Sequence, residues 1–130
     1  MTTSTAGIQT ISLVMVPTAD QDRSIEFYEK LGFEKRTDTP FGGGMRWVEV
    51  YPPEGNTGIA LSPPRPGEEV TPKEIGISLT TADADATHAA LRDHGVDVDD
   101  QVMRMGDPIP PMFWFRDPEG HALMIVESQR

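Results

Sequence analysis

One helix-like segment, Asp20-Gln-Asp-Arg-Ser-Ile-Glu-Phe-Tyr-Glu-Lys-Leu-Gly32, decides how the rest of the chain is interpreted. Aspartate favours the start of a helix because its carboxylate accepts a free backbone N–H, and glycine favours the position after the last turn. Between these ends, small and apolar residues recur at helical spacing: Ser24, Phe27, Tyr28 and Leu31. The segment therefore predicts a helix with one face that must pack against another element.

The same pattern returns in the second half of the chain. Asp83 and Gly95 bound another segment, and they follow Asp20 and Gly32 by the same 63 positions. Its predicted packing face carries Ala84, Thr87, His88 and Leu91. This spacing indicates that one structural unit is written twice.

Short runs of apolar and β-branched residues flank both helices and predict strands. In the first half they cover residues 11–16, 33–38, 46–51 and 57–62, and in the second half 75–80, 96–100, 113–116 and 122–127. Residues 46–51 and 113–116 each run into a Pro-Glu-Gly turn. The chain therefore predicts a single α+β domain of two βαβββ modules, about 8–62 and 73–128, joined by a proline-rich linker at 63–72.

These two signatures resemble those of a known superfamily. The segment from Asp20 to Phe33 is similar to the first helix of vicinal-oxygen-chelate proteins, the glyoxalase/bleomycin resistance/extradiol dioxygenase group. Asp117-Pro-Glu-Gly-His-Ala-Leu-Met-Ile-Val-Glu127 resembles the closing hairpin of that group. The resemblance implies two mixed sheets that curl into a cup, with one helix on the outer face of each.

The resemblance also implies where a metal ion would bind. Metal-dependent members place a His, Gln or Glu ligand on the first and last strand of each module. Here those positions fall on Leu13, Ala60, Gly76 and Met124, none of which offers a ligand for a hard divalent cation. We therefore expect no metal and no other cofactor, with a set formed by Glu49, His121 and Glu127 as the alternative.

Strand alternation predicts which side chains line the cup. We assign Val48, Val50, Phe113 and Phe115 to the face that packs against the helices. The opposite face then carries aromatic residues with one acid and one base: Trp47, Glu49, Tyr51, Met112, Trp114 and Arg116. Met15 and Met124 add adaptable apolar surface. Such a face suits a planar or cationic ligand, and the alternative is that the tryptophans pack in a dimer interface.

Three functions stay open at this point. The first is metal-independent binding of a small aromatic or cationic molecule, for sequestration or transport, as in the resistance members of the group. The second is a metal-independent isomerase, cyclase or lyase with Glu49 as its base and Arg116 holding an anionic group. The third is a glyoxalase-like lyase or dioxygenase with displaced metal ligands.

Composition restricts the binding partners that we expect and the cellular compartment of the protein. The formal net charge of -10 disfavours nucleic acid, and the absence of cysteine excludes disulfides and thiolate chemistry. No apolar run is long enough for a signal peptide or membrane span, so we expect a cytoplasmic protein without membrane contact. The resemblance implies a homodimer, with modules exchanged between chains as one option. The loop at 101–111 is a candidate lid.

Overall fold

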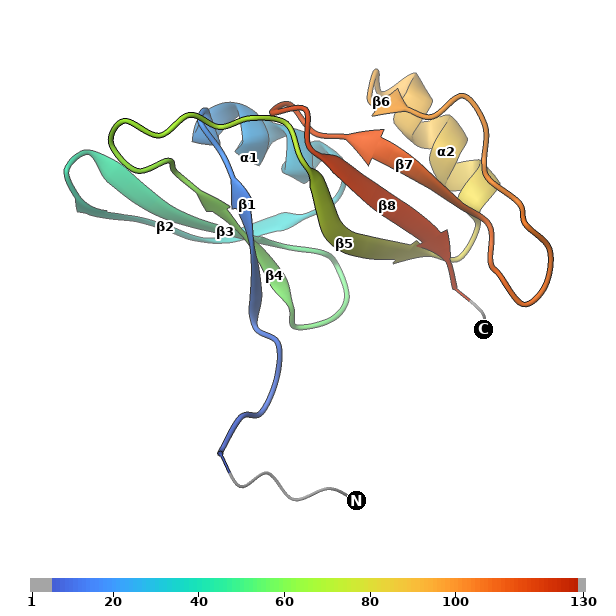
Figure 1. The fold of residues 1–130 in the computed structure, drawn as a ribbon, viewed down its shortest axis with the longest axis horizontal. Coiled ribbons are helices and arrows are strands. Elements are labelled where there is room, and N and C mark those ends of the chain that lie inside the picture. The colour runs from blue at the N-terminus through green and yellow to red at the C-terminus, as the bar shows by residue number, and fades with distance from the viewer. Residues whose placement is uncertain (1–5, 129–130) are drawn as a thin grey trace.

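The computed structural model describes residues 6–128, which fold as two βαβββ modules placed side by side (Figure 1). Module one contains β1 (Leu13–Pro17), α1 (Gln21–Lys30), β2 (Glu34–Gly42), β3 (Met45–Tyr51) and β4 (Gly58–Ser62). Module two contains β5 (Glu74–Thr81), α2 (Ala84–Asp93), β6 (Asp97–Val98), β7 (Met112–Arg116) and β8 (Ala122–Glu127). The predicted α+β class and its duplicated unit are confirmed.

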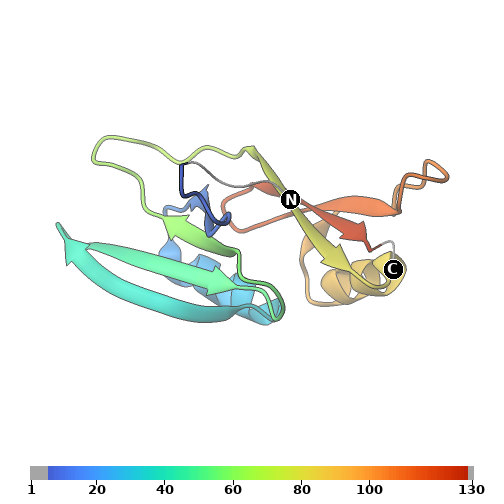
Figure 2. The same ribbon diagram turned by 90° about the horizontal axis from the view of Figure 1, so that it is seen from below.

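Each module forms its own mixed sheet. The strand order is β1-β4-β3-β2 in module one and β5-β8-β7-β6 in module two. The first and last strands of each module pair in parallel, and the remaining pairs are antiparallel. Parallel neighbours need a crossover connection, which in each module contains the helix. The second view again shows the modules side by side (Figure 2).

The helix boundaries follow from the predicted caps. The Asp20 carboxylate accepts the backbone N–H of Arg23 at 3.0 Å, and Asp83 accepts that of Ala86 at 3.0 Å. Both carboxylates satisfy an N–H group that has no partner inside the first helical turn. The buried side of α1 includes Tyr28, and that of α2 includes Leu91, as their spacing predicted.

One face of each sheet packs against its helix, and we call this the helix face. On it Val48, Val50, Phe113 and Phe115 are at most 1% exposed, which confirms their predicted assignment. We call the opposite face the cup face. Residues of adjacent strands share a face when their registers match, so Leu13 and Met15 of β1 lie on the cup face beside Gly58 and Ala60 of β4.

Three predicted strand boundaries are wrong. β1 begins at Leu13, and Ile11 before it is 73% exposed. β6 is reduced to Asp97–Val98, whereas β2 extends to Gly42, where it pairs with Met45 across a tight hairpin. The lengths of these strands are set by the partner strand beside them, which local composition does not encode.

The modules are held together by the turn at residues 117–121. Within it, Asp117 accepts a hydrogen bond from the Tyr28 hydroxyl of α1 at 3.1 Å. Glu119 accepts the backbone N–H of Asp20 at 3.0 Å and pairs with Arg23 at 3.3 Å. The turn of module two therefore docks on the first helix of module one. None of the helices described in residues 6–128 is long and apolar enough to cross a membrane.

Candidate functional site

The cup face of module one presents a carboxylate held by two aromatic side chains. The indole N–H of Trp47 donates to Glu49 Oε2 at 2.7 Å, and the Tyr51 hydroxyl donates to Glu49 Oε1 at 2.8 Å. These residues alternate along β3, which brings all three to the same face, and each is half-buried. The sequence-based expectation that they share a face is consistent with this geometry.

Packing around Tyr51 keeps this cluster in place. A Cβ atom at Gly58 would lie 2.7 Å from the Tyr51 ring, so the tyrosine needs a glycine beneath it. The Arg36 guanidinium lies 4.4 Å from the centre of the same ring. The hydrogen bond to Glu49, with burial and the charge of Glu49, raises the pKa of Tyr51, so its hydroxyl remains a donor.

The cup face of module two carries a base in place of the acid. Arg116 pairs with Asp99 at 2.8 Å and reaches Asp97 at 3.8 Å. Asp99 also accepts the backbone N–H of Trp114 at 3.2 Å, which fixes it beside β7. Because its charge is already matched by two carboxylates, Arg116 has less free charge to offer a ligand than its sequence suggested.

The remaining predicted binding residues join these two groups. Met15 pairs in register with Ala60 of β4 and is 53% exposed, and Met112 precedes Trp114 on β7. Met124 lies opposite Trp114. The structure thus gathers the predicted residues in two sets, one on each cup face. None of them lines the groove of about 840 Å³ that the described residues form between the modules.

The positions at which the family resemblance places metal ligands do not fit a metal ion here. Leu13 and Ala60 lie on the cup face of module one, and Met124 lies on that of module two, whereas Gly76 falls in an irregular stretch of β5. Hydrocarbon side chains, a glycine and a thioether supply no oxygen or nitrogen donor for a divalent cation. No chemical step can be derived through a metal at these positions.

The alternative metal set is not supported. Within residues 6–128, no three His, Cys, Asp or Glu side chains lie close enough to hold an ion. Glu49 is engaged by Trp47 and Tyr51, and Glu127 accepts the backbone N–H of Ala84 at 3.0 Å.

His121, the histidine of that alternative metal set, is fully buried. Its Nδ1 accepts the Lys73 backbone N–H at 3.1 Å, so Nε2 carries the proton and donates to the Pro17 carbonyl at 2.7 Å. With both ring nitrogens satisfied, His121 joins the modules and has no free site for a metal or proton transfer.

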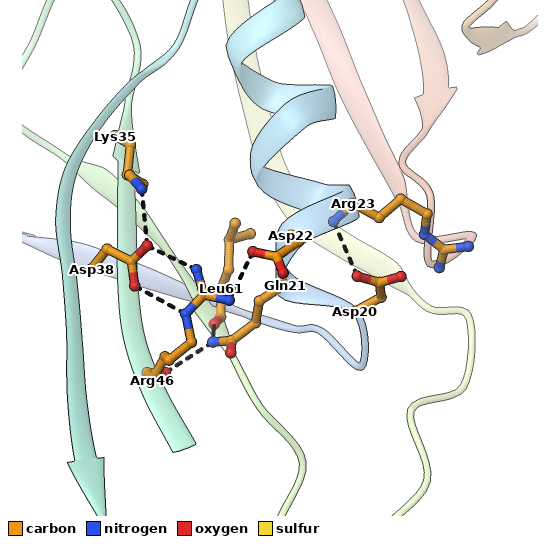
Figure 3. Close-up of polar contacts among 8 residues, drawn as sticks. All are labelled: Asp20, Gln21, Asp22, Arg23, Lys35, Asp38, Arg46 and Leu61. Carbon is orange, nitrogen blue, oxygen red and sulfur yellow. Dashed lines mark hydrogen bonds and ion pairs between the residues drawn. The ribbon is translucent and has the colours of Figure 1, made fainter. Parts of the chain in front are cut away.

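The charged cluster on the other side of β3 is structural. Arg46 points to the helix face, where it makes paired bonds to Asp38 at 3.0 and 2.8 Å and one to Asp22 of α1 at 2.8 Å (Figure 3). These bonds, with that from Lys35, hold the pKa of Asp38 well below its usual range. Arg46 therefore fastens β2, β3 and α1 together and takes no part in the cup.

The candidate lid is anchored at its start. Met103 pairs with Met112 through backbone bonds of 2.7 and 3.1 Å, and Arg104 pairs with Asp85 in the first turn of α2. These contacts bring this part of the loop to the helix side of β7. Closure over the cup stays a prediction of the sequence.

Sequence reasoning missed three contributors to the site. Arg36 stacks on Tyr51 because the register shifts between Lys35 and Thr37, which breaks the alternation used to sort faces. Gly58 supports Tyr51, and Asp99 neutralises Arg116. Of these three residues, only Gly58 could have been recognised from the sequence. An isolated glycine in a strand often marks a place where another group packs closely against the backbone.

Comparison with known proteins gives consistent results. The model of the Glyoxalase/Bleomycin resistance protein/Dioxygenase superfamily matches residues 10–125. TnmS3, an antibiotic binding protein from Streptomyces sp. CB03234, superposes with a TM-score of 0.78 at 30% identity, over 95% of this chain and 98% of that one. A superfamily member from Sphaerobacter thermophilus DSM 20745 gives 0.80 at 32%, over 93% and 98%. The uncharacterized protein YurT of Bacillus subtilis (strain 168) is 32% identical, over 84% of this chain and 91% of its own.

Proposed function

Because the chain belongs to the Glyoxalase/Bleomycin resistance protein/Dioxygenase superfamily, we propose that it binds a small planar aromatic molecule on its cup faces without a metal ion. The protein would sequester or carry this molecule. The similarity to TnmS3, whose name describes antibiotic binding, supports binding over catalysis. The lack of an oxygen or nitrogen donor in the side chains of Leu13, Ala60, Gly76 and Met124 supports metal independence.

The observation that carries the proposal is the cluster of Trp47, Glu49 and Tyr51. Its two hydrogen bonds of 2.7 and 2.8 Å hold the carboxylate of Glu49 between aromatic rings before any ligand arrives. Aromatic rings offer large, flat surfaces for stacking, and a carboxylate beside them favours a positively charged group. The preferred ligand is therefore a planar aromatic cation.

The same bonds argue against the enzymatic alternative, in which Glu49 acts as a base. The donors of Trp47 and Tyr51 each occupy a lone pair on one oxygen of the Glu49 carboxylate. A base that must take up a proton from its substrate gains nothing from such partners. The arrangement suits a fixed acceptor for a ligand donor better than proton abstraction.

A second copy of the chain would complete the binding site. The two modules of one chain lie side by side (Figure 1). Their cup faces carry the predicted residues in two separate sets, one on β3 and one on β7 and β8. A homodimer could set a cup face of one protomer against that of its partner and enclose a ligand between them. Sedimentation velocity should then give a dimer at micromolar concentration, and a monomer would contradict this part of the proposal.

Calorimetric titration with proflavine, a planar aromatic cation, tests the ligand class. We expect wild-type protein to bind it, and Glu49→Gln to weaken binding by about fivefold, since one nearby charge contributes about 1 kcal/mol. Glu26→Gln removes an exposed carboxylate from α1, outside both the cup faces and the groove lining, and is the matched control. It should leave the affinity unchanged.

Two results would count against the proposal. Equal affinity for proflavine and for the anion pyrenesulfonate would show that the carboxylate does not select the ligand. If Glu49→Gln retains affinity for a compound that the wild type converts but the variant does not, Glu49 acts as a base and the enzymatic alternative is correct.

A further inference from the structure

A groove of about 840 Å³ separates the modules away from the predicted binding residues. From module one, it is lined by Val14, Ile59 and the turn at residues 52–57, and from module two by β5 and the α2 residues Thr87 and Leu91. Val14 and Ile59 belong to the helix face, opposite Trp47 and Glu49. The groove also reaches Gly58 and Ser78 at the edges of the cup faces, but Trp47, Glu49 and Tyr51 do not line it.

The internal duplication explains why this groove exists. On the other side of the junction between the modules, the turn at 117–121 docks on α1 through the bond from Tyr28 to Asp117 at 3.1 Å. Burial, and then the charge of Asp117, raise the pKa of Tyr28, so that its hydroxyl stays protonated as the donor. A ring contact between Phe27 and Phe115, 6.3 Å between centres, adds to this closed junction.

The residues at the equivalent positions cannot close the groove in the same way. Leu91 of α2 takes the place of Tyr28, at the same 63-residue offset that relates the helix caps. Pro52, which precedes the Pro-Glu-Gly turn of module one, takes the place of Asp117. A leucine and a proline form no side-chain hydrogen bond, and both line the groove. The junction at the 117–121 turn is closed by the hydrogen bond between Tyr28 and Asp117, whereas the equivalent junction at Leu91 and Pro52 stays open as the groove.

The lining of the groove indicates what it would accept. Apolar side chains dominate it, including Leu31, Ile77 and Leu79. Among the described lining residues Glu54 is the one charged side chain, and no Lys or Arg is present. With a net charge of -10 on the chain, an anionic ligand is disfavoured. The hydroxyls of Thr81 and Thr87, 2.6 Å apart, provide a polar spot.

We propose that this groove is a second binding site, which takes an uncharged, mainly hydrocarbon small molecule with one hydroxyl or carbonyl group. Its volume falls in the range of small-molecule pockets, about 300–1,000 Å³. Burial of apolar ligand surface against the aliphatic lining supplies the affinity. The polar group of the ligand would bond to the hydroxyl pair of Thr81 and Thr87.

The sharpest test rebuilds the closed junction in the groove. The double variant Pro52→Asp with Leu91→Tyr places a carboxylate and a phenol where the counterpart junction has Asp117 and Tyr28. Nile red, an uncharged apolar dye, should bind wild-type protein at one saturable site with a rise in fluorescence. The double variant should bind it at least about tenfold more weakly, a loss of about 1.4 kcal/mol.

A second variant keeps the test valid if the double variant does not fold. Ile77→Trp fills the groove from β5 and should weaken Nile red binding to a similar extent, with folding checked by circular dichroism. Ile8→Ser is the matched control, because Ile8 is 77% exposed and lies outside the groove lining. This control should bind the dye as the wild type does.

Three outcomes would overturn the proposal. Unchanged dye affinity in folded groove variants would show that the groove is not the site. A loss of affinity in Trp47→Ala, with the groove variants unaffected, would place the dye in the cup. Conversion of a dimer to a monomer by the groove variants, seen by sedimentation velocity, would mean that a second copy of the chain covers the groove.

Discussion

β3 and β7 occupy the same place in their modules, yet only one of their two faces is alike. On the helix face, Val48 and Val50 of β3 correspond to Phe113 and Phe115 of β7, and all four are buried. On the cup face, β3 carries an acid held by Trp47 and Tyr51, whereas β7 carries a base neutralised by Asp99.

This contrast separates the demands of folding from those of binding. The helix face must fill a fixed space, so its residues differ in size while remaining apolar. The cup face is not constrained in this way, and the two copies carry different polar residues there, Glu49 on β3 and Arg116 on β7. Substitutions on the two faces should therefore lower the free energy of unfolding to different degrees.

Removing a ring from the helix face should cost far more stability than removing one from the cup face. Phe113→Ala leaves a cavity at a fully buried position and should lower the free energy of unfolding by about 3–5 kcal/mol. Trp114→Ala, its neighbour on the cup face, should lower it by roughly 1–2 kcal/mol. Urea unfolding measures both, and equal losses would show that the two faces do not differ in this respect.

The support beneath Tyr51 gives the next largest effect. In Gly58→Ala the new methyl group meets the ring at 2.7 Å, so Tyr51 must move away from Glu49. We expect a loss of about 1–3 kcal/mol and a change in Trp47 fluorescence. Gly76→Ala is the control, because its methyl group has nothing within 4 Å. If both variants behave alike, Tyr51 does not depend on Gly58.

The ion pair on the helix face of β3 should make stability depend on pH. Asp38→Asn removes the partner of Arg46 and should lower the free energy of unfolding at neutral pH by about 1–2 kcal/mol. Because folding depresses the pKa of Asp38, its contribution is complete above the unfolded value of about 4 and is lost as the pH falls below it.

The comparison of the two proteins across pH checks this sign. The stability difference between wild type and Asp38→Asn should shrink progressively below about pH 4 in thermal unfolding. Asp22→Asn serves as the control, since the Asp22 side chain is 82% exposed and its bond to Arg46 should contribute less. A difference that persists unchanged at pH 2 would contradict the assignment.

Neutralising the acid of the cup face should have the smallest effect on folding. Glu49 is half-buried, and a glutamine can still accept one of its two hydrogen bonds. We expect Glu49→Gln to change the free energy of unfolding by no more than about 0.5 kcal/mol, with ligand affinity as the sensitive readout. A large loss in urea unfolding would mean that this acid is needed for folding.

Much of the fold could be predicted because repetition, caps and alternation are local signals. Asp20 and Asp83 marked both helices, and alternation placed Val48 and Phe113 on the buried face. The extent of β2 could not be predicted, because β3 determines it through pairing. The contact of Arg36 with the Tyr51 ring could not be predicted, because the register shift at Arg36 breaks the alternation of side chains along β2.

The sequence could predict which residues belong to the candidate site, but not the contacts that they make. Alternation selected Trp47, Glu49 and Tyr51, but their hydrogen bonds depend on side-chain geometry that spacing does not contain. The neutralisation of Arg116 and the burial of His121 both involve residues distant in sequence. The groove could not be predicted either. It lies where Leu91 and Pro52 form no side-chain hydrogen bond between the modules.

The bond from His121 to Pro17 spans 104 positions of the chain. During translation the first module leaves the ribosome well before its docking turn, so Tyr28 and the end of β1 lack their partners until nearly all of the chain has been made. Contacts that close such long loops slow folding, and the waiting surface is open to aggregation and proteolysis. A nascent chain stalled before the last strand should therefore be the form most in need of chaperones.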